Sequence, residues 1–79
     1  MKRIVIERNN LTGWFCLRHE DGRYEETRLP ITRRVGDVAK IVAKANPGAQ
    51  IGCLSADFGP ICTLEFGNVV WLRPDFCSA

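Results

Sequence analysis

A single stretch of the chain has the apolar periodicity of an α-helix, and it limits the folds open to the whole sequence. Residues 31–44 read ITRRVGDVAKIVAK, and apolar side chains fill more than half of the helix circumference. So broad an arc must be buried against another element, and 79 residues suffice for one core only. Thr32 is expected to cap the helix, and Pro47 to end it. The sequence therefore predicts a helix that covers one face of a sheet.

Six β-rich stretches flank this helix, three before it and three after it. Each is rich in β-branched or aromatic residues and is bounded by turn-forming residues. The order β-β-β-α-β-β-β predicts a single α+β domain over residues 1–79, with a mostly antiparallel sheet and one helix packed on one face. The predicted strands are residues 2–8, 14–19, 23–29, 50–55, 61–66 and 69–73.

Two dipeptides set the predicted register of the hairpins. Asp21-Gly22 and Gly67-Asn68 are both typical of two-residue hairpin loops. With such a loop at Asp21-Gly22, opposite charges would face each other on one side of the first hairpin. The predicted cross-strand pairs are Arg18 with Glu25, Glu20 with Arg23, and Trp14 with Leu29.

The charge is modest, uneven and rich in Arg. The formal net charge is +2, with ten basic and six acidic residues among residues 1–49, and eight of the eleven basic residues are Arg. Arg suits interfaces because it forms bidentate contacts with carboxylate or phosphate. The chain start lacks the apolar run of a signal peptide, and no segment approaches the ~20 apolar residues of a membrane span. We therefore expect a cytoplasmic protein without a membrane partner.

The four cysteines have no spacing typical of a metal site. They lie at 16, 53, 62 and 77, and none forms a Cys-x-x-Cys pair. We expect Cys16, Cys53 and Cys62 to be small buried thiols and Cys77 to lie in the tail. A structural disulfide and a metal site are less favoured alternatives.

No residue pattern predicts catalysis. His19 and Cys16 are three residues apart on a strand and so point to opposite faces, which prevents a local Cys–His dyad. His19 is instead expected to be exposed on the hairpin. The acidic pairs at 20–21 and 25–26 also point to opposite faces, so neither forms an acid–base couple. We expect no catalytic residue, no metal and no cofactor.

The polar face of the predicted helix carries a thin basic stripe. Arg33, Lys40 and Lys44 share it with Asp37, and Arg34 flanks them. It offers no Asn, Gln or Ser to read base edges, which favours a solvated or protein-binding face over a nucleic-acid face. Tyr24 is expected to be exposed. The other aromatic residues considered are expected in the core: Trp14, Phe15, Phe58, Phe66 and Trp71.

The layout resembles that of small phage and mobile-element inhibitors, anti-CRISPR proteins above all. The resemblance covers the KRIVIER…WFCLRHEDGRYEETRL meander, the single helix and the ICTLEFGNVVWLR hairpin. It implies a cofactor-free protein in the host cell cytoplasm that blocks a larger protein or ribonucleoprotein complex such as a CRISPR–Cas effector. Residues 1–45 are also similar to the truncated ribonuclease-H-like domain of certain antitoxins, which implies protein binding too.

The sequence thus predicts a non-enzymatic binding protein that inhibits or modulates a larger complex. A small basic nucleic-acid-binding module or an antitoxin-like protein binder is the alternative, and homodimerisation would help to stabilise so small a chain. Arg and Tyr are common interface anchors, and the first hairpin and the helix stripe concentrate charge. The candidate partner-binding residues are Arg18, Arg23, Tyr24, Glu25, Glu26, Arg28, Arg33, Arg34, Lys40 and Lys44.

Overall fold

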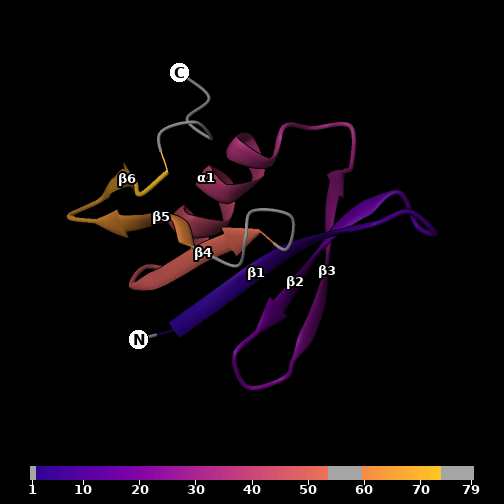
Figure 1. Cartoon of the computed structure of the whole chain (residues 1–79), viewed down its shortest axis with the longest axis horizontal. Coiled ribbons are helices and arrows are strands. Elements are labelled where there is room, and N and C mark those ends of the chain that lie inside the picture. The colour runs from indigo at the N-terminus through magenta and orange to yellow at the C-terminus, as the bar shows by residue number, and fades with distance from the viewer. Residues whose placement is uncertain (1, 54–59, 74–79) are drawn as a thin grey trace.

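The residues that the structure describes form one six-stranded sheet with a single helix, as the sequence predicts. The computed structural model describes residues 2–53 and 60–73 (Figure 1). The elements are β1 (Lys2–Asn9), β2 (Trp14–His19), β3 (Tyr24–Pro30), α1 (Val35–Ala45), β4 (Ala49–Cys53), β5 (Pro60–Glu65) and β6 (Asn68–Trp71). Within the described residues, no helix has the length and apolar content needed to cross a membrane.

The strand order is β3-β2-β1-β4-β5-β6. The two halves of the chain meet at the parallel pair β1–β4, and the other pairings are antiparallel. The sheet is therefore mixed but mostly antiparallel. The parallel pair requires a crossover, and α1 supplies it by leading from the edge strand β3 back to β4 beside β1. Figure 1 shows α1 lying over the β4–β5 side of the sheet.

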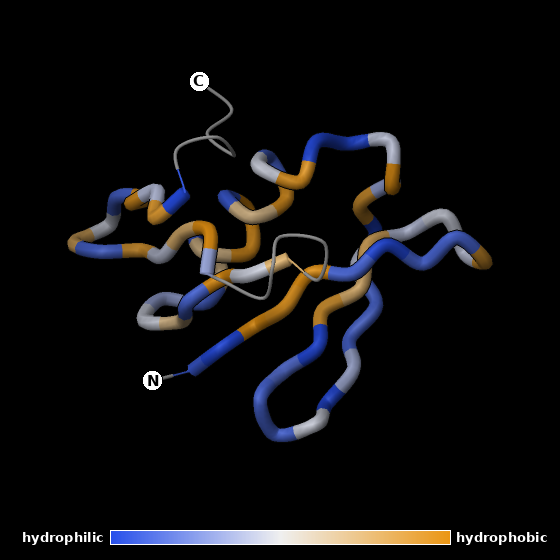
Figure 2. The backbone as a smooth tube through the Cα atoms, in the orientation of Figure 1, coloured by the Kyte–Doolittle hydropathy of each residue, from blue (hydrophilic) through white to orange (hydrophobic). Residues whose placement is uncertain are grey.

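The core lies between α1 and one face of the sheet. Alternation along β1 sends Ile4 and Ile6 into it, while Val5 and Glu7 point to the other face. In Figure 2 the tube is hydrophobic in colour along the middle of β1 and mostly hydrophilic around the tip of the β2–β3 hairpin. The remaining hydrophobic members of the cluster are Phe15, Leu17, Val38, Ala39, Val42, Ala43, Ala49, Ile51, Cys53, Ile61 and Cys62.

The helix begins later than Thr32 predicts. Its N-cap is Arg34, which has an extended backbone and makes no side-chain cap hydrogen bond. The preceding residues form a turn instead, in which the Arg33 amide donates to the Pro30 carbonyl at 3.0 Å. Arg33 and Arg34 therefore precede α1 and are not part of a helical stripe. The end of the helix at Asn46 agrees with the prediction from Pro47.

The first hairpin has a three-residue loop, so its predicted register is wrong by one. The His19 amide donates to the Arg23 carbonyl at 2.8 Å, and the Gly22 amide donates to the His19 carbonyl at 3.0 Å. Gly22 has φ of +90°, whereas Asp21 stays out of the positive-φ region. This is a type I turn followed by a left-handed glycine, which adds one residue to the loop.

None of the three predicted cross-strand pairs therefore forms. Arg18 faces Tyr24, and Glu25 faces Leu17. Further along, a bulge between Trp14 and Cys16 shifts the pairing again, so that Trp14 faces Pro30 in place of Leu29.

The second hairpin keeps a two-residue loop, but that loop lies one residue earlier than predicted. Glu65 pairs with Asn68, so the loop is Phe66-Gly67 and not Gly67-Asn68. Both loop residues have positive φ, +51° at Phe66 and +79° at Gly67, which is the pattern of a type I′ turn. Phe66 is 99% exposed, so its predicted place in the core is wrong.

The other aromatic and cysteine predictions mostly hold. Phe15 is buried, Tyr24 is exposed, and Trp14 and Trp71 are half-buried. Cys16, Cys53 and Cys62 are buried thiols. Burial raises the pKa of Cys62 to about 11. Phe58, Cys77 and the predicted last residues of the fourth strand lie outside the described residues.

Candidate functional site

The face of the sheet opposite α1, here called the open face, carries a continuous row of residues across five strands. Strand pairing aligns Tyr24 on β3, Arg18 on β2, Val5 on β1, Gly52 on β4 and Pro60 on β5. Their neighbours along each strand point towards α1, because side chains alternate between faces. This row brings together residues that lie far apart in the sequence.

Arg18 is held in a fixed orientation on the open face. Its Nε donates to Glu7 Oε2 at 2.8 Å, its Nη2 donates to Oε1 at 3.4 Å, and its Cζ lies 5.6 Å from the centre of the Tyr24 ring. The hydrogen bond and charge of Glu7 raise the pKa of Arg18 above its usual value. The Arg18 side chain is still 60% exposed, so the outer edge of the guanidinium remains accessible to a partner. Glu7, Arg18 and Tyr24 together are called the arginine site.

Tyr24 is exposed but also held by its surroundings. A side-chain hydrogen bond with Cys16 is the main cause that raises the pKa of the Tyr24 phenol. Cys16 is fully buried on the same face of β2 as Arg18. One side of the Tyr24 ring therefore faces the guanidinium, and its hydroxyl group lies against the sheet. At ordinary pH the phenol is neutral and serves as a contact group.

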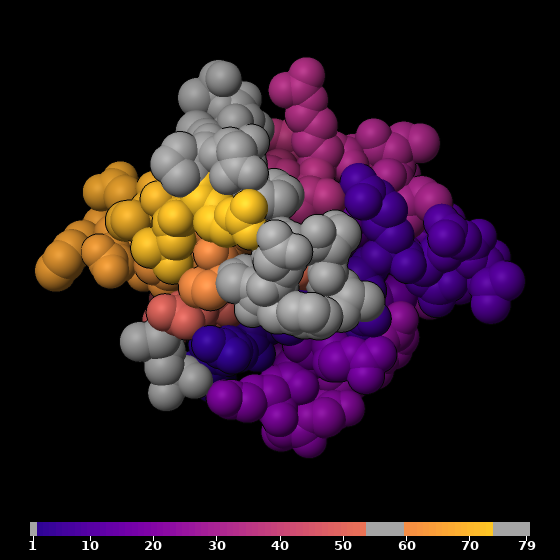
Figure 3. All heavy atoms as spheres, viewed as in Figure 1, coloured from indigo at the N-terminus to yellow at the C-terminus, as the bar shows by residue number. Residues whose placement is uncertain are grey.

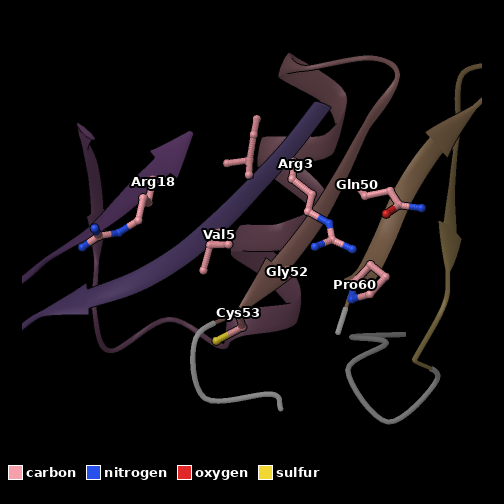
Figure 4. Close-up of a pocket in the computed structure, with 8 residues that line it drawn as sticks. Arg3, Val5, Arg18, Gln50, Gly52, Cys53 and Pro60 are labelled. Carbon is pink, nitrogen blue, oxygen red and sulfur yellow. The ribbon is translucent and has the colours of Figure 1, made fainter. Parts of the chain in front are cut away.

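Beside the arginine site, the open face contains a mostly apolar hollow of about 210 Å³. Gly52, which has no side chain, lies beside it, next to Val5 and Pro60. Figure 4 shows Arg3 directed towards the β4–β5 side of this hollow, with Arg18 on the far side of Val5. Within the described part of the chain Arg3 makes no ion pair. The hollow is thus apolar with a cationic rim.

The tip of the first hairpin holds a second polar cluster on the other face of the sheet. It consists of His19, Arg23 and Glu25 and is here called the His19 cluster. His19 Nε2 lies 2.9 Å from Glu25 Oε1, and Arg23 Nη2 lies 3.2 Å from His19 Nδ1. The His19 side chain is only 9% exposed, so the prediction of an exposed histidine is wrong. The reason is the longer loop, which places His19 and Glu25 on the same side. His19 and Cys16 lie on opposite faces of the sheet.

The structure separates the ten predicted binding residues into five places. Arg18, Tyr24 and Glu26 lie on the open face, and Arg23 and Glu25 belong to the His19 cluster. Arg28 is exposed on the edge strand β3, and Arg33 and Arg34 lie in the turn before α1. Lys40 and Lys44 are on α1, where Lys44 is in the last turn and exposed. Arg18 and Tyr24 contact each other directly, whereas Arg23 and Glu25 meet through His19.

Glu7 and Arg3 were missed from the sequence. In the β1–β2 hairpin Arg18 faces Val5, so Glu7 is its diagonal neighbour and within reach of a long side chain. Pairing of the first two predicted strands could have indicated this contact. No sequence signal indicates the hollow, because it needs β1 and β4 side by side.

The chain has no match among known proteins: no family model, no curated protein and no solved structure is similar to it. In residues 2–53 and 60–73, no group of three or more His, Cys, Asp or Glu side chains could hold a metal ion. The site is therefore interpreted from its own geometry.

Proposed function

We propose that this chain is a non-enzymatic binding protein whose arginine site contacts a larger protein or ribonucleoprotein complex. The observation that carries the proposal is the fixed Arg18 guanidinium, held by Glu7 and Tyr24 while most of its surface stays accessible. A side chain that is already ordered loses less entropy on binding. Arg and Tyr are also the side chains most often found as interface anchors.

The mixture of charges favours a protein surface over a phosphate backbone. Glu7 and Glu26 lie on the same face as Arg18, and like charges would repel phosphate groups there. The Tyr24 ring already faces the guanidinium, which leaves it less free to stack on a base. A partner with a carboxylate beside an apolar or aromatic group would complement this site.

The polar residues of the His19 cluster support binding better than catalysis. His19 is engaged at both ring nitrogens, by Glu25 and by Arg23. The thiol of Cys16 is on the other face of the strand, so the imidazole has no nucleophile to activate there.

A nucleic-acid-binding module is the second candidate. Lys2, Arg3 and Arg23 line a hollow of about 300 Å³ near the hairpin tip, which gives a local excess of positive charge. Glu20 and Asp21 line the same hollow and reduce that excess. We therefore rank the nucleic-acid-binding module below the protein-binding function.

Pull-down with purified protein tests the first candidate. The resemblance to anti-CRISPR proteins makes CRISPR–Cas effector complexes the first purified partners to test, followed by capture from a host lysate. Arg18→Gln and Tyr24→Ala should each abolish capture, and Lys44→Gln, which removes one exposed charge from α1, should retain it. Loss of capture with Lys44→Gln but not with Arg18→Gln would place the interface on α1 and overturn the proposal.

Binding to random duplex and single-stranded DNA at two salt concentrations tests the second candidate. Phosphate contacts make affinity fall steeply with salt, with a slope of about −0.9 per contact on duplex DNA. Salt-sensitive DNA binding that Arg23→Gln weakens and Arg18→Gln leaves unchanged would favour the nucleic-acid module.

A further inference from the structure

Phe66 occupies a position that the fold itself does not favour. It is the first residue of the β5–β6 loop, with φ of +51°, and it is 99% exposed. A bulky residue is strained in this backbone region, where Asn, Asp or Gly fit better. Full exposure means that no packing within the chain offsets the strain. Figure 3 shows that the β5–β6 hairpin projects from the body of the molecule, so its tip is free to enter another surface.

The open-face hollow has the size and lining to receive a phenyl ring. Its volume is about 210 Å³, and Val5, Gly52 and Pro60 provide an apolar lining. An apolar cavity of roughly 150 Å³ is large enough to bind benzene. The chain therefore carries both a fully exposed aromatic ring and a hollow that could bury one.

The charges beside these two features are complementary. Glu65 precedes Phe66 and is exposed, while Arg3 lies at the rim of the hollow. Neither forms an ion pair within the residues that the structure describes. A Phe66 ring in the hollow would bring the adjacent Glu65 carboxylate close to the Arg3 guanidinium.

Within one chain the ring cannot reach the hollow. Pro60, at the hollow, and Phe66 are at opposite ends of β5, about 20 Å apart at ~3.3 Å per residue. Two copies with their open faces opposed can make the contact twice, with a two-fold axis midway between Phe66 and the hollow. Such an interface is closed, because each copy gives one ring and receives one.

We propose that two copies of this chain form a reciprocal dimer in which Phe66 of each copy fills the open-face hollow of the other, with Glu65 paired to Arg3 of the other copy. Arg18 also lines this hollow, so the dimer and a partner at the arginine site would share the open face, but the dimer is tested on the protein alone. The strained loop at Phe66 is then explained by an interface that holds its ring.

Sedimentation equilibrium of the purified protein over a wide concentration range tests the dimer. The wild-type protein should show a monomer–dimer equilibrium, and Phe66→Asn should raise the dissociation constant at least ~30-fold, as expected for loss of an interface anchor. Phe66→Asn suits the loop geometry, so it should remain folded. Leu11→Asn, which alters another fully exposed apolar residue in a different loop, is the matched control and should leave the dimer unchanged.

Charge exchange identifies the contact. Arg3→Glu and Glu65→Arg should each weaken the dimer, and the double variant should restore it, because every contact then again joins opposite charges. An equimolar mixture of the two single variants should also form a heterodimer. A wild-type protein that stays monomeric at every concentration, or a dimer that Phe66→Asn leaves intact, would overturn the proposal. Failure of the charge exchange to restore the dimer would overturn the assigned pairing.

Discussion

Glu7 on β1 and Arg18 on β2 form the one ion pair of the open face within the described residues, with Arg18 Nε 2.8 Å from Glu7 Oε2. The Glu7 side chain is 15% exposed, whereas that of Arg18 is 60% exposed. The carboxylate is therefore the fixed member of the pair, and it positions a guanidinium whose outer edge is accessible.

Glu7→Gln should separate the positioning of Arg18 from its charge. The amide keeps the shape of the side chain but replaces a charge-assisted contact with a neutral one, so Arg18 becomes less ordered. The fold should persist, because the pair lies near the surface. Affinity for the partner should fall about tenfold through lost preorganisation. The check is binding measured beside NMR of the Arg18 Nε–H group, with Glu20→Gln, at an exposed loop residue outside the arginine site, as a control. An unchanged Arg18 signal would contradict this account.

Gly22→Ala should destabilise the protein by about 1 kcal/mol or more. Gly22 has φ of +90°, and alanine is strained in that region. Chemical denaturation measures the loss. Glu20→Ala, in the same loop but without positive φ, should change the free energy of unfolding by less than about 0.5 kcal/mol. Equal effects of the two substitutions would show that the loop does not require a positive φ at Gly22.

The helix and the strands could be predicted because their signals are local. The apolar arc of α1 and the β-branched run of Ile4, Val5 and Ile6 can be seen within a few residues. The length and position of the hairpin loops were harder to predict from the sequence. Asp21-Gly22 and Phe66-Gly67 both contain a glycine with positive φ. In the second loop Phe66 also has positive φ, whereas in the first Asp21 does not. One additional loop residue in the first hairpin, and a one-residue displacement of the loop in the second, changed which side chains meet across each hairpin.

The site was harder to predict than the fold because it depends on contacts between distant segments. Arg18 and Tyr24 were both predicted as binding residues, but their contact was not, because the predicted register paired Arg18 with Glu25. The hollow needs Gly52 beside Val5, and that contact follows from the parallel pairing of β1 and β4. The helix crossover sets this pairing, and no local pattern in either strand indicates it.

Phe66→Asn should raise the stability of the monomer by about 1 kcal/mol. Asn-Gly is the preferred sequence of a type I′ turn, whereas a bulky residue in the left-handed region costs of order 1–3 kcal/mol. Thermal or chemical denaturation at concentrations low enough to keep the protein monomeric measures the gain. Phe66→Ala should gain less, because alanine keeps the strain. A loss of stability with Phe66→Asn would show that the ring packs within its own chain.

Asp21 should make the first hairpin sensitive to acid. Asp21 Oδ1 accepts a hydrogen bond from the Arg23 amide at 3.0 Å, and this bond is the main cause that lowers the pKa of Asp21 from its ordinary value of 3.8. A lowered pKa in the folded state means that Asp21 stabilises the fold above the ordinary value. That contribution disappears as the pH falls through the folded-state pKa.

Asp21→Asn is the variant that isolates this effect. Its side-chain oxygen still accepts from the Arg23 amide, but it does not titrate. The wild-type protein should therefore lose more stability than the variant when the pH falls from neutral to below the pKa of Asp21, and the two should respond alike above it. Amide chemical shifts of Gly22 and Arg23, followed over the same pH range, locate the change in the loop. If the acid response of the variant matches that of the wild type, the hydrogen bond of Asp21 contributes nothing to stability.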